Sequence, residues 1–493
     1  MSEMSPLFKF FSILLVSLVS ASSLVYGLDG IETIDVGGKP VSSVFAYSKL
    51  YINNEQDNNV TVLDTNTHKI LKKIEVGKKP ISSFLVGKNI YVNNFGDNFL
   101  SVIDGLTSLV TKSILVDSFP NYSRHAAAKL YVTNSGSDTI SIINTTTESW
   151  LKNIKLGQSV TQPSAVFVTW GKVLVLNLWS ANVTIIDEKT GSFKKLIPVS
   201  GSPIDGTVVG KKVYLYSPTH NTISIVDASK DAFADNITLE TGSVSGTLIG
   251  TKLYVNHPTS NTVSVIDTAS DSLLRTIPVW LSPMSSTLMG THLYVNNSKG
   301  NSVSVIDTVT NTVTKTIPVE AGPVFSLRVG NKLYVHSADA GKISVIYQDA
   351  PLLNSLSSTT ANGKYGIGAK IDISMIFDQP LLTGSTATVT LNNGVILTLS
   401  KVDGRSLFWE YVVATGQDKA DLSVTSLKDV KIIGISGLQN TVYAIPTWKN
   451  LGDDKNIVID SKITTTTPAT PTPVELACRD TGMYRLCPLT KTP

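Results

Sequence analysis

Short apolar runs alternate with small polar turns along most of the chain. Residues 253–267 read LYVNHPTSNTVSVID, a pattern that predicts two short strands joined by a polar turn. Near copies recur with a tyrosine at one fixed place, or leucine in the fourth copy: Tyr51, Tyr91, Tyr131, Leu174, Tyr214, Tyr254, Tyr294 and Tyr334. Most neighbouring copies lie 40 residues apart, so this part of the chain is a sequence repeat.

Four strands are predicted within each repeat. In the second repeat they cover residues 80–86, 90–93, 100–104 and 110–116, which are rich in residues that favour strands. The second and third strands are apolar or small on both faces, and this indicates that both faces are buried. Stacked blades of a β-propeller bury both faces in this way. A solenoid of stacked β coils is the alternative, but it would need capping units that the sequence does not show.

The repeat count predicts an eight-bladed β-propeller over residues 28–350, within an all-β chain. Eight copies of the paired strands are present, but the eighth copy, which ends at Tyr347, lacks a following fourth strand. The missing strand is predicted near the start of the chain, in residues 31–36 (IETIDV). Pairing of this strand with the eighth blade closes the ring and removes an exposed sheet edge.

These repeats resemble the YVTN family of β-propeller repeats. The resemblance rests on KLYVTN (129–134), KLYVNH (252–257), VSVIDT (263–268 and 303–308) and the TIPV strands (276–279 and 316–319). It covers roughly residues 30–350. Archaeal and bacterial cell-surface and surface-layer proteins carry such repeats, so the resemblance implies a location more than a chemistry. The family is usually seven-bladed, and the predicted eight blades depart from it.

The segments on either side of the repeats predict export and a second domain. Residues 1–27 hold a basic residue, an apolar run and small residues, the pattern of a signal peptide, with an uncleaved N-terminal anchor as the alternative. A hinge is predicted over 351–363. Over 364–461, strands separated by Asn-Gly and Asp-Gly turns predict a β-sandwich. In the first of these strands, residues 370–377, the alternation places Ile371, Ile373, Met375 and Phe377 on one side.

The stretch GAKIDISMIFDQPLLTG and the residues that follow resemble Ig-like modules of large bacterial surface proteins. A Thr/Pro-rich linker (462–473) and a short tail (474–493) end the chain. The two cysteines of the chain, Cys478 and Cys487, lie in this tail and are candidates for a disulfide in an oxidising compartment. Six Asn-x-Ser/Thr sequons are candidate glycosylation sites. They are Asn59, Asn121, Asn144, Asn182, Asn236 and Asn296.

A basic residue stands two places before most of the repeat tyrosines. The set comprises Lys49, Lys129, Lys172, Lys212, Lys252 and Lys332, with His292 in the seventh repeat and Asn89, beside Lys88, in the second. A ring of lysines favours an anionic partner. Aspartates that end the third strands offer a competing explanation, namely cross-strand ion pairs. The expected pairs are Lys49–Asp64, Lys172–Asp187, Lys212–Asp227 and Lys252–Asp267.

Alternatively, these aspartates accept hydrogen bonds from the amides of the following turn. The repeats of Lys129 and Lys332 lack the aspartate, so these two lysines, together with Lys88, form the predicted anionic-ligand rim. The repeat tyrosines are predicted to be core residues rather than a sugar-stacking face.

No catalytic constellation is apparent in the sequence. It contains neither a Cys-x-x-Cys-His haem motif nor a Gly-x-Ser-x-Gly elbow. His220, His257 and His336 belong to different blades, so we expect neither a metal site nor a cofactor. Among the residues that depart from the repeat, Trp179 and Trp280 are candidate partner contacts.

The predicted function is that of a non-enzymatic, exported scaffold at the cell surface, either a surface-layer component or an adhesin. Its expected partners are other surface proteins or cell-envelope glycans. The charged fraction is 16% and the net charge +3, which gives no reason to expect nucleic acid. No membrane span is expected beyond the N-terminal segment. The alternative prediction is a propeller enzyme or redox-cofactor binder outside the cytoplasm. Titratable groups clustered in a central channel would favour that alternative, whereas a channel lined by Ser and Thr would favour the scaffold.

Overall fold

The computed structural model describes residues 31–157, 162–348, 351–398, 401–435, 439–440, 443, 445 and 450–464. The predicted signal segment, the tail with Cys478 and Cys487, and most of the Thr/Pro-rich linker lie outside the described residues. Within the described part no helix is both long enough and apolar enough to cross a bilayer.

The described residues up to 348 form eight four-stranded antiparallel sheets, numbered here in chain order. Sheet 1 contains β2 (Pro40–Ala46), β3 (Lys49–Asn54), β4 (Asn59–Asp64) and β5 (Ile70–Glu75). Sheet 2 contains β6 (Pro80–Val86), β7 (Asn89–Asn94), β8 (Phe99–Asp104) and β9 (Leu109–Leu115). Sheet 3 contains β10 (Pro120–Ala126), β11 (Lys129–Asn134), β12 (Thr139–Asn144) and β13 (Ser149–Lys155). Sheet 4 contains β14 (Pro163–Thr169), β15 (Lys172–Asn177), β16 (Asn182–Asp187) and β17 (Phe193–Pro198).

The other four sheets repeat this order. Sheet 5 contains β18 (Asp205–Val209), β19 (Lys212–Tyr216), β20 (Thr222–Asp227) and β21 (Ala232–Thr238). Sheet 6 contains β22 (Ser245–Ile249), β23 (Lys252–His257), β24 (Thr262–Asp267) and β25 (Ser272–Pro278). Sheet 7 contains β26 (Pro283–Met289), β27 (His292–Asn297), β28 (Ser302–Asp307) and β29 (Thr312–Pro318). Sheet 8 contains β30 (Pro323–Val329), β31 (Lys332–Ser337), β32 (Lys342–Tyr347) and β1 (Glu32–Asp35).

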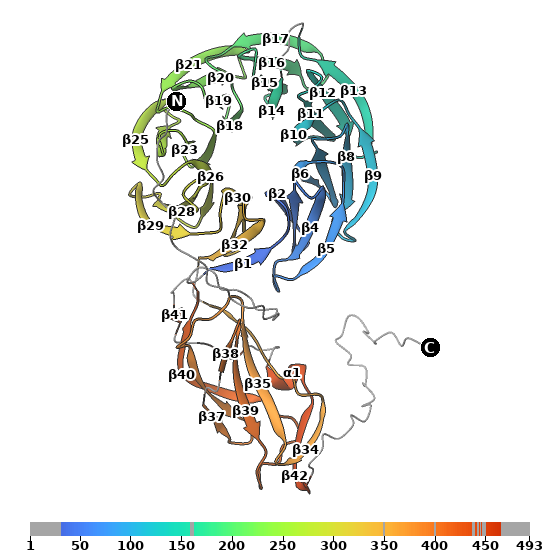
Figure 1. Ribbon diagram of the computed structural model, residues 1–493, viewed down its shortest axis with the longest axis vertical. Coiled ribbons are helices and arrows are strands. Elements are labelled where there is room, and N and C mark those ends of the chain that lie inside the picture. The colour runs from blue at the N-terminus through green and yellow to red at the C-terminus, as the bar shows by residue number, and fades with distance from the viewer. Residues whose placement is uncertain are drawn as a thin grey trace, which may run out of the picture.

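The sheets are arranged around a common centre (Figure 1). First strands such as β2 and β6 face the centre, and fourth strands such as β5 and β9 lie on the outside. The fourth strand of sheet 8 is β1, which pairs with β32 from Glu32 opposite Val345 to Asp35 opposite Lys342. The pairing predicted for the segment at residues 31–36 is therefore confirmed.

The hydrophobic core lies between neighbouring sheets. In β3, Leu50 packs in one cluster with Ile34 and Tyr334 of sheet 8, while Tyr51 packs in another with Ile90 of sheet 2. Successive residues of a strand point to opposite faces, so each sheet is covered on both faces by its neighbours. Complete burial of one such side chain stabilises the fold by roughly 1.5–3 kcal/mol.

A second domain of two sheets follows the eight-sheet domain. One sheet contains β33 (Leu353–Ser357), β35 (Lys370–Phe377), β39 (Ser406–Val412) and β38 (Lys401–Asp403). The other contains β37 (Ile396–Leu397), β36 (Thr386–Leu391), β40 (Val424–Ile433) and β41 (Gln439–Asn440). A parallel pair, β34 (Gly363–Ile367) and β42 (Ile457–Thr464), and the short helix α1 (Leu451–Asp454) complete it. Ile373, Val389 and Trp409 share one buried core between the sheets.

Two parts of the second domain differ from the prediction. The expected hinge at 351–363 contains β33, which pairs with β35 and belongs to the domain. Its sequence, LNSLS, is largely polar and gave no strand signal. The long strand β40 was also missed, because Asp429 adopts a left-handed backbone (φ 49°) and the pairing of β36 with β40 shifts register. Such irregularities break the two-residue alternation on which strand prediction depends.

Arg405, in the turn between β38 and β39, joins the second domain to the eight-sheet domain. Its guanidinium donates to the Glu32 carboxylate (2.9 and 3.1 Å), to the carbonyl of Asn66 (2.7 Å) and to the Tyr347 hydroxyl (3.0 Å). Glu32 and Tyr347 belong to sheet 8, whereas Asn66 follows the third strand of sheet 1. One side chain of the second domain therefore contacts both sheets at the place where the two ends of the eight-sheet domain meet.

His68 of sheet 1 completes this buried cluster. Its Nδ1 lies 2.7 Å from Glu32 Oε1, and its Nε2 lies 3.0 Å from the Tyr334 hydroxyl. Burial lowers the pKa of His68, and the hydrogen bond and charge of the adjacent Glu32 oppose this shift without outweighing it. Burial by itself raises the pKa of Glu32. The bonds and charges of His68, Arg405 and Tyr347 outweigh burial and lower that pKa to about 2.

Candidate functional site

The polar residues that recur in the repeat are used inside the fold. In sheet 1, Asn53 Nδ2 donates to Ser42 Oγ of the same sheet (2.8 Å) and to Ser83 Oγ of sheet 2 (2.9 Å). The same pair of bonds to two serines is made by Asn93, Asn256 and Asn296. These asparagines join neighbouring sheets, so they are structural rather than binding residues.

The repeat tyrosines and lysines reach the next sheet. The Tyr51 hydroxyl donates to the carbonyl of Gly105 (2.7 Å), and Lys49 Nζ donates to the carbonyl of Leu106 (3.0 Å), both in the turn after the third strand of sheet 2. Tyr51 is completely buried. The predicted core role of the tyrosines is confirmed, and the hydroxyls of Tyr51, Tyr214, Tyr254 and Tyr334 each add a bond between sheets.

The four predicted cross-strand ion pairs are wrong, although their register is right. Lys49 stands opposite Asp64, and the other three pairs are opposed in the same way. Instead, the ammonium of Lys172 lies 2.5 Å from Asp231 of the next sheet. Lys212 pairs likewise with Asp271, and Lys252 Nζ donates to the carbonyl of Thr308. The long side chains extend past their own sheet to the neighbouring turn.

The alternative role of these aspartates is confirmed. Asp64 Oδ1 accepts hydrogen bonds from the amides of Asn66 and Thr67, both at 2.8 Å. Asp104 and Asp307 do the same in their own turns. A short aspartate side chain at the end of a strand is well placed to satisfy the amides of the following turn.

The predicted rim of free lysines is also corrected. Lys129 Nζ donates to the carbonyl of Glu188 (2.9 Å), and Lys332 Nζ donates to that of Thr65 (2.8 Å). Burial, and then the charge of Arg405, lower the pKa of Lys332 to about 8. Lys88 is exposed, but its ammonium lies 2.7 Å from Asp104. In each case an oxygen atom of the next sheet or of the same sheet already bonds to the ammonium group.

The six sequons differ in accessibility. Asn296 is completely buried with both amide hydrogen bonds made, and Asn59 is buried as well, so glycosylation of these two is incompatible with the fold. Asn121, Asn144 and Asn182 are half-buried and bonded within the domain. Asn236 is exposed on β21, and glycosylation there stays a prediction.

Strand direction gives the eight-sheet domain two distinct sides. In sheet 1, Pro40 of β2 pairs with Asn54 of β3, which pairs in turn with Asn59 of β4, and Asn59 pairs with Glu75 of β5. First strands therefore begin on the side where second strands end, together with the loops that connect one sheet to the next. We call this the proline side, because most first strands begin with proline. The lysines discussed above lie on the opposite side.

Exposed aromatic residues occupy the proline side. Trp179 and Trp280, the predicted partner contacts, are 66% and 56% exposed, in the turn after β15 and in the loop before β26. Phe119, in the loop before β10, is 47% exposed and stacks on Phe95, with 5.3 Å between ring centroids. These residues lie at positions that vary from repeat to repeat.

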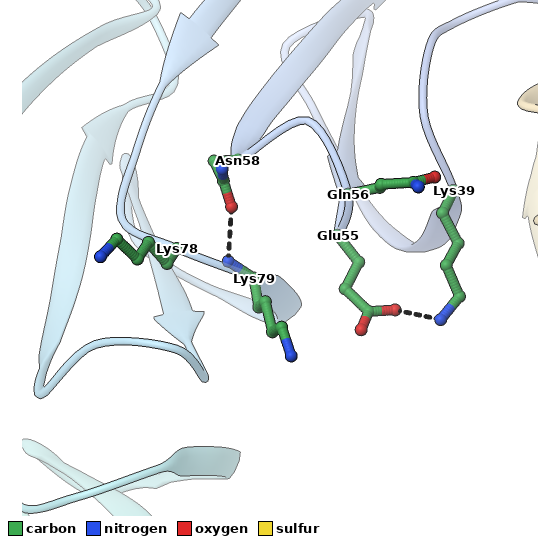
Figure 2. Close-up of a pocket in the computed structure, with 6 residues that line it drawn as sticks. All are labelled: Lys39, Glu55, Gln56, Asn58, Lys78 and Lys79. Carbon is green, nitrogen blue, oxygen red and sulfur yellow. Dashed lines mark hydrogen bonds and ion pairs between the residues drawn. The ribbon is translucent and has the colours of Figure 1, made fainter.

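A hollow of about 420 Å³ opens on the proline side between sheets 1 and 2. We call it the basic hollow, and its lining is Lys39, Glu55, Gln56, Asn58, Lys78 and Lys79. Lys39 Nζ lies 2.6 Å from the Glu55 carboxylate, and Asn58 Oδ1 accepts from the amide of Lys79 (2.9 Å). In Figure 2 the side chain of Lys78 extends away from the Lys39–Glu55 pair, whereas that of Lys79 points toward the side on which Glu55 lies.

Sequence reasoning missed the basic hollow. The available signal was Gly-Lys-Pro at 38–40 and Lys-Lys-Pro at 78–80, because lysine precedes the first-strand proline only in the first two repeats. Lys39 and Lys79 have left-handed backbones (φ 57° and 51°), as Phe119 does at the equivalent position of sheet 3 (φ 58°). Sheet 8 has Gly322 there (φ 71°). The backbone conformation recurs from repeat to repeat, whereas lysine occurs at this position only in the first two repeats.

The inner strands of sheets 3 and 5 carry the clearest titratable groups near the centre. Tyr122 and Asp205 occupy the place where sheets 1 and 2 have Ser42 and Ser82. Burial raises the pKa of Asp205 to about 6, although a bond from the Gly206 amide and the charge of Arg124 oppose it. Asp205 is half-buried, so protein surrounds most of its side chain and solvent reaches the rest.

No group of three or more His, Cys, Asp or Glu residues in the described part of the chain could hold a metal ion. His257 and His336 are buried and His220 is exposed, and each lies in a different sheet. The exposed groups of the proline side include lysines and aromatic rings.

Comparison with known proteins identifies the type of fold. Residues 88–203 match the family model of the YNCE-like beta-propeller, which is less than half of the chain. No curated protein matches the chain. The matched part of the chain contains sheets 3 and 4 and the last three strands of sheet 2.

Several solved structures are similar. Sqt1 from Saccharomyces cerevisiae is 11% identical, with a TM-score of 0.55 over 63% of this chain and 97% of Sqt1. The computationally designed protein Ika8 is also 11% identical, with a TM-score of 0.54 over 63% of this chain and 96% of Ika8. The dihydro-heme d1 dehydrogenase NirN, in complex with DHE, is 10% identical, with a TM-score of 0.52 over 65% of this chain and 78% of NirN. At such identities the likeness shows a β-propeller fold and nothing about function.

Proposed function

We propose that this β-propeller protein is an exported, non-enzymatic interaction scaffold of the cell surface. In this proposal a closed, eight-bladed propeller of the YVTN type is the binding head, and an Ig-like second domain is its spacer. The pairing of β1 with β32 and the bond from Lys332 to Thr65 support closure. The common core of the two sheets of the second domain supports the Ig-like assignment.

One contrast carries the functional proposal. The recurring Asn, Ser, Lys and Tyr residues are used for contacts between sheets, as in Asn53 and Tyr51. The exposed positions of the proline side differ from repeat to repeat and include Trp179, Trp280 and Phe119. Large exposed aromatic residues on a rigid frame are typical of surfaces that bind other molecules.

The test compares the two sides of the propeller. The full chain and a variant with Phe119→Ser, Trp179→Ser and Trp280→Ser are screened against cell-envelope glycans and extracellular proteins. The matched control carries Tyr47→Ser and Trp170→Ser, which remove aromatic residues 46% and 61% exposed on the opposite side. We expect the first variant to lose a partner that the control retains. Equal binding by all three proteins would contradict the proposal.

Export is tested separately, by locating the protein in fractionated cells. Recovery in the surface or extracellular fraction is the expected result. Retention of the full chain inside the cell would refute the proposed location, and it would leave the binding comparison to be judged by itself.

Asp205 favours a second candidate function, that of a propeller enzyme or redox-cofactor binder. Its raised pKa of about 6 and the neighbouring charge of Arg124 are features of groups that transfer protons. A cofactor absorbance band in the purified protein, lost on Asp205→Asn, would support this candidate. Absence of such a band, together with a proline-side partner, would favour the scaffold.

A further inference from the structure

We infer that the basic hollow binds an acidic oligosaccharide, with Lys78 and Lys79 pairing with its carboxylates. This inference rests on the proposed role of the proline side as the binding surface, and it names the class of ligand. The hollow's volume of about 420 Å³ lies within the usual range for ligand pockets, roughly 300–1,000 Å³.

Two cations of the hollow are available to a ligand. Lys39 is paired with Glu55 at 2.6 Å, whereas Lys78 and Lys79 are exposed. Within the described residues, neither of these two ammonium groups lies within ion-pair distance of a carboxylate. Asp97 is close by, but its carboxylate accepts from the backbone amide of Lys78 (2.6 Å). Both ammonium groups are therefore free to meet an anion.

The mixed character of the lining favours a sugar over a polyphosphate. Glu55, Gln56 and Asn58 provide oxygen acceptors, which suit the hydroxyl groups of a sugar. The carboxylate of Glu55, and that of Asp97 beside the hollow, repel any anion, and this repulsion is stronger for a closely spaced row of phosphates than for carboxylates set one sugar apart. An acidic sugar presents both hydroxyls and separated carboxylates, so it can satisfy both parts of the lining.

Aromatic rings lie beside the hollow. The amide of Phe95 donates to the carbonyl of Lys79 (2.9 Å), which fixes this phenylalanine next to the lysine pair. Phe95 stacks on Phe119, and the two rings form a partly exposed apolar surface. The apolar face of a sugar ring can cover such a surface while its polar edge reaches Lys78 and Lys79.

The backbone at the hollow allows the lysine side chain to be removed without disturbing the fold. A left-handed backbone is unfavourable for residues with a Cβ atom and unstrained for glycine. Lys39 and Lys79 occupy such positions, where sheet 8 has Gly322. Phe119, Gln162 and Ser282 share this conformation, so it belongs to the repeat, and glycine at position 79 should fit the same backbone without strain.

The test uses the full chain and polygalacturonate as the probe, in a buffer of low ionic strength. We expect direct binding that weakens as salt is added, because exposed charges are screened. Lys78→Gln with Lys79→Gln should weaken binding at least tenfold. The matched control, Lys189→Gln with Lys230→Gln, removes two exposed lysines from the opposite side and should bind like the original chain.

A further variant separates binding from folding. Lys79→Gly should lower the affinity for polygalacturonate while the melting midpoint stays the same or rises. A drop in the midpoint that accompanies the loss of binding would contradict the strain argument.

Three outcomes would overturn the inference: no binding of polygalacturonate at low salt, equal loss in the control, or tighter binding of polyphosphate than of polygalacturonate. If polygalacturonate does not bind, but binding of another partner requires Trp179 and Trp280, then only the inference about the basic hollow is wrong. If no partner depends on the proline side at all, the proposed function falls with it.

Discussion

Junctions between consecutive sheets differ from the junction between sheet 8 and sheet 1. Consecutive sheets are joined near the centre by serine hydroxyls, as from Ser42 to the carbonyl of Ile81 and from Ser285 to that of Val324, both at 2.9 Å. At the junction of sheets 8 and 1, Lys332 and Tyr334 keep the repeat bonds to Thr65. His68 takes the turn position that Ser108, Asp271 and Asn311 have in other sheets, and Glu32 and Arg405 add an ion pair with the second domain that the other described junctions lack.

The difference follows from distance along the chain. The bond from Lys332 to Thr65 connects residues 267 positions apart, whereas Ser42 and Ile81 are 39 apart. Bringing distant segments together costs more conformational entropy, although the cost grows slowly with length. The junction between the two ends of the repeat keeps the bonds that the repeat encodes, and Arg405, from outside the repeat, adds to them.

Among changes at the junction of sheets 8 and 1, removal of residues 31–36 should lower stability the most. The deletion removes β1, its hydrogen bonds to β32 and the Glu32 carboxylate, so we expect the free energy of unfolding to fall by several kcal/mol. Urea unfolding measures the change, with a chain that lacks only residues 1–27 as control. An unchanged midpoint would show that β1 does not hold sheet 8.

Arg405→Met should have the next largest effect. It leaves the Glu32 carboxylate buried without its guanidinium partner, and breaking such a pair costs about 3–5 kcal/mol. Urea unfolding of the full chain measures this change as well. The double variant Arg405→Met with Glu32→Gln should recover part of the loss, because no unpaired charge remains. Equal stability of the single and double variants would argue against an ionic role.

Acid should weaken the same junction. The folded pKa of Glu32 is about 2 and its ordinary value is 4.5, so its contribution is present above pH 4.5 and is lost as the pH falls toward 2. The difference corresponds to about 3 kcal/mol. His68 acts in the same direction: its pKa is lowered in the folded chain, so protonation below its ordinary value of 6.5 favours the unfolded chain.

The measurement is urea unfolding over this pH range, compared with the Arg405→Met and Glu32→Gln double variant. A weaker dependence on pH in the double variant is expected. The same dependence in both proteins would place the acid-sensitive groups elsewhere.

Asn256→Ala should have the smallest of these effects. It removes the bonds from one amide to Ser245 and Ser286, and such bonds contribute about 0.5–1.5 kcal/mol each. Thermal unfolding measures the loss. Asn98→Ala, an exposed residue in the turn after β7, is the control and should change stability by less than about 0.5 kcal/mol.

Much of the first domain could be predicted from its period. The spacing of the tyrosines placed the strands, and the unpaired eighth copy placed β1 against β32. The register of Lys49 with Asp64 was also right, but the contact was wrong, because one repeat by itself does not reveal where the turn of the next sheet lies. Strand pairing within a repeat can be predicted from the sequence, whereas side-chain contacts between repeats can be predicted only in part.

Residues outside the repeat were much harder to predict. Asp403-Gly404 correctly signalled the turn before β39, but nothing in the sequence indicates that Arg405 reaches Glu32 and Tyr347. The basic hollow was missed for a related reason. Its lysines come from two successive repeats, and only the arrangement of sheets 1 and 2 brings Lys39 and Lys79 around one space.

The position of Arg405 has a mechanical consequence. The second domain is connected to sheet 8 through the chain and to sheet 1 through the bond from Arg405 to Asn66, and it lies beside β1 and β32 (Figure 1). A pulling force on the far end of the second domain would therefore act on the junction between sheets 8 and 1, rather than on one sheet alone. The buried ion pair between Arg405 and Glu32 lies in the path of this force.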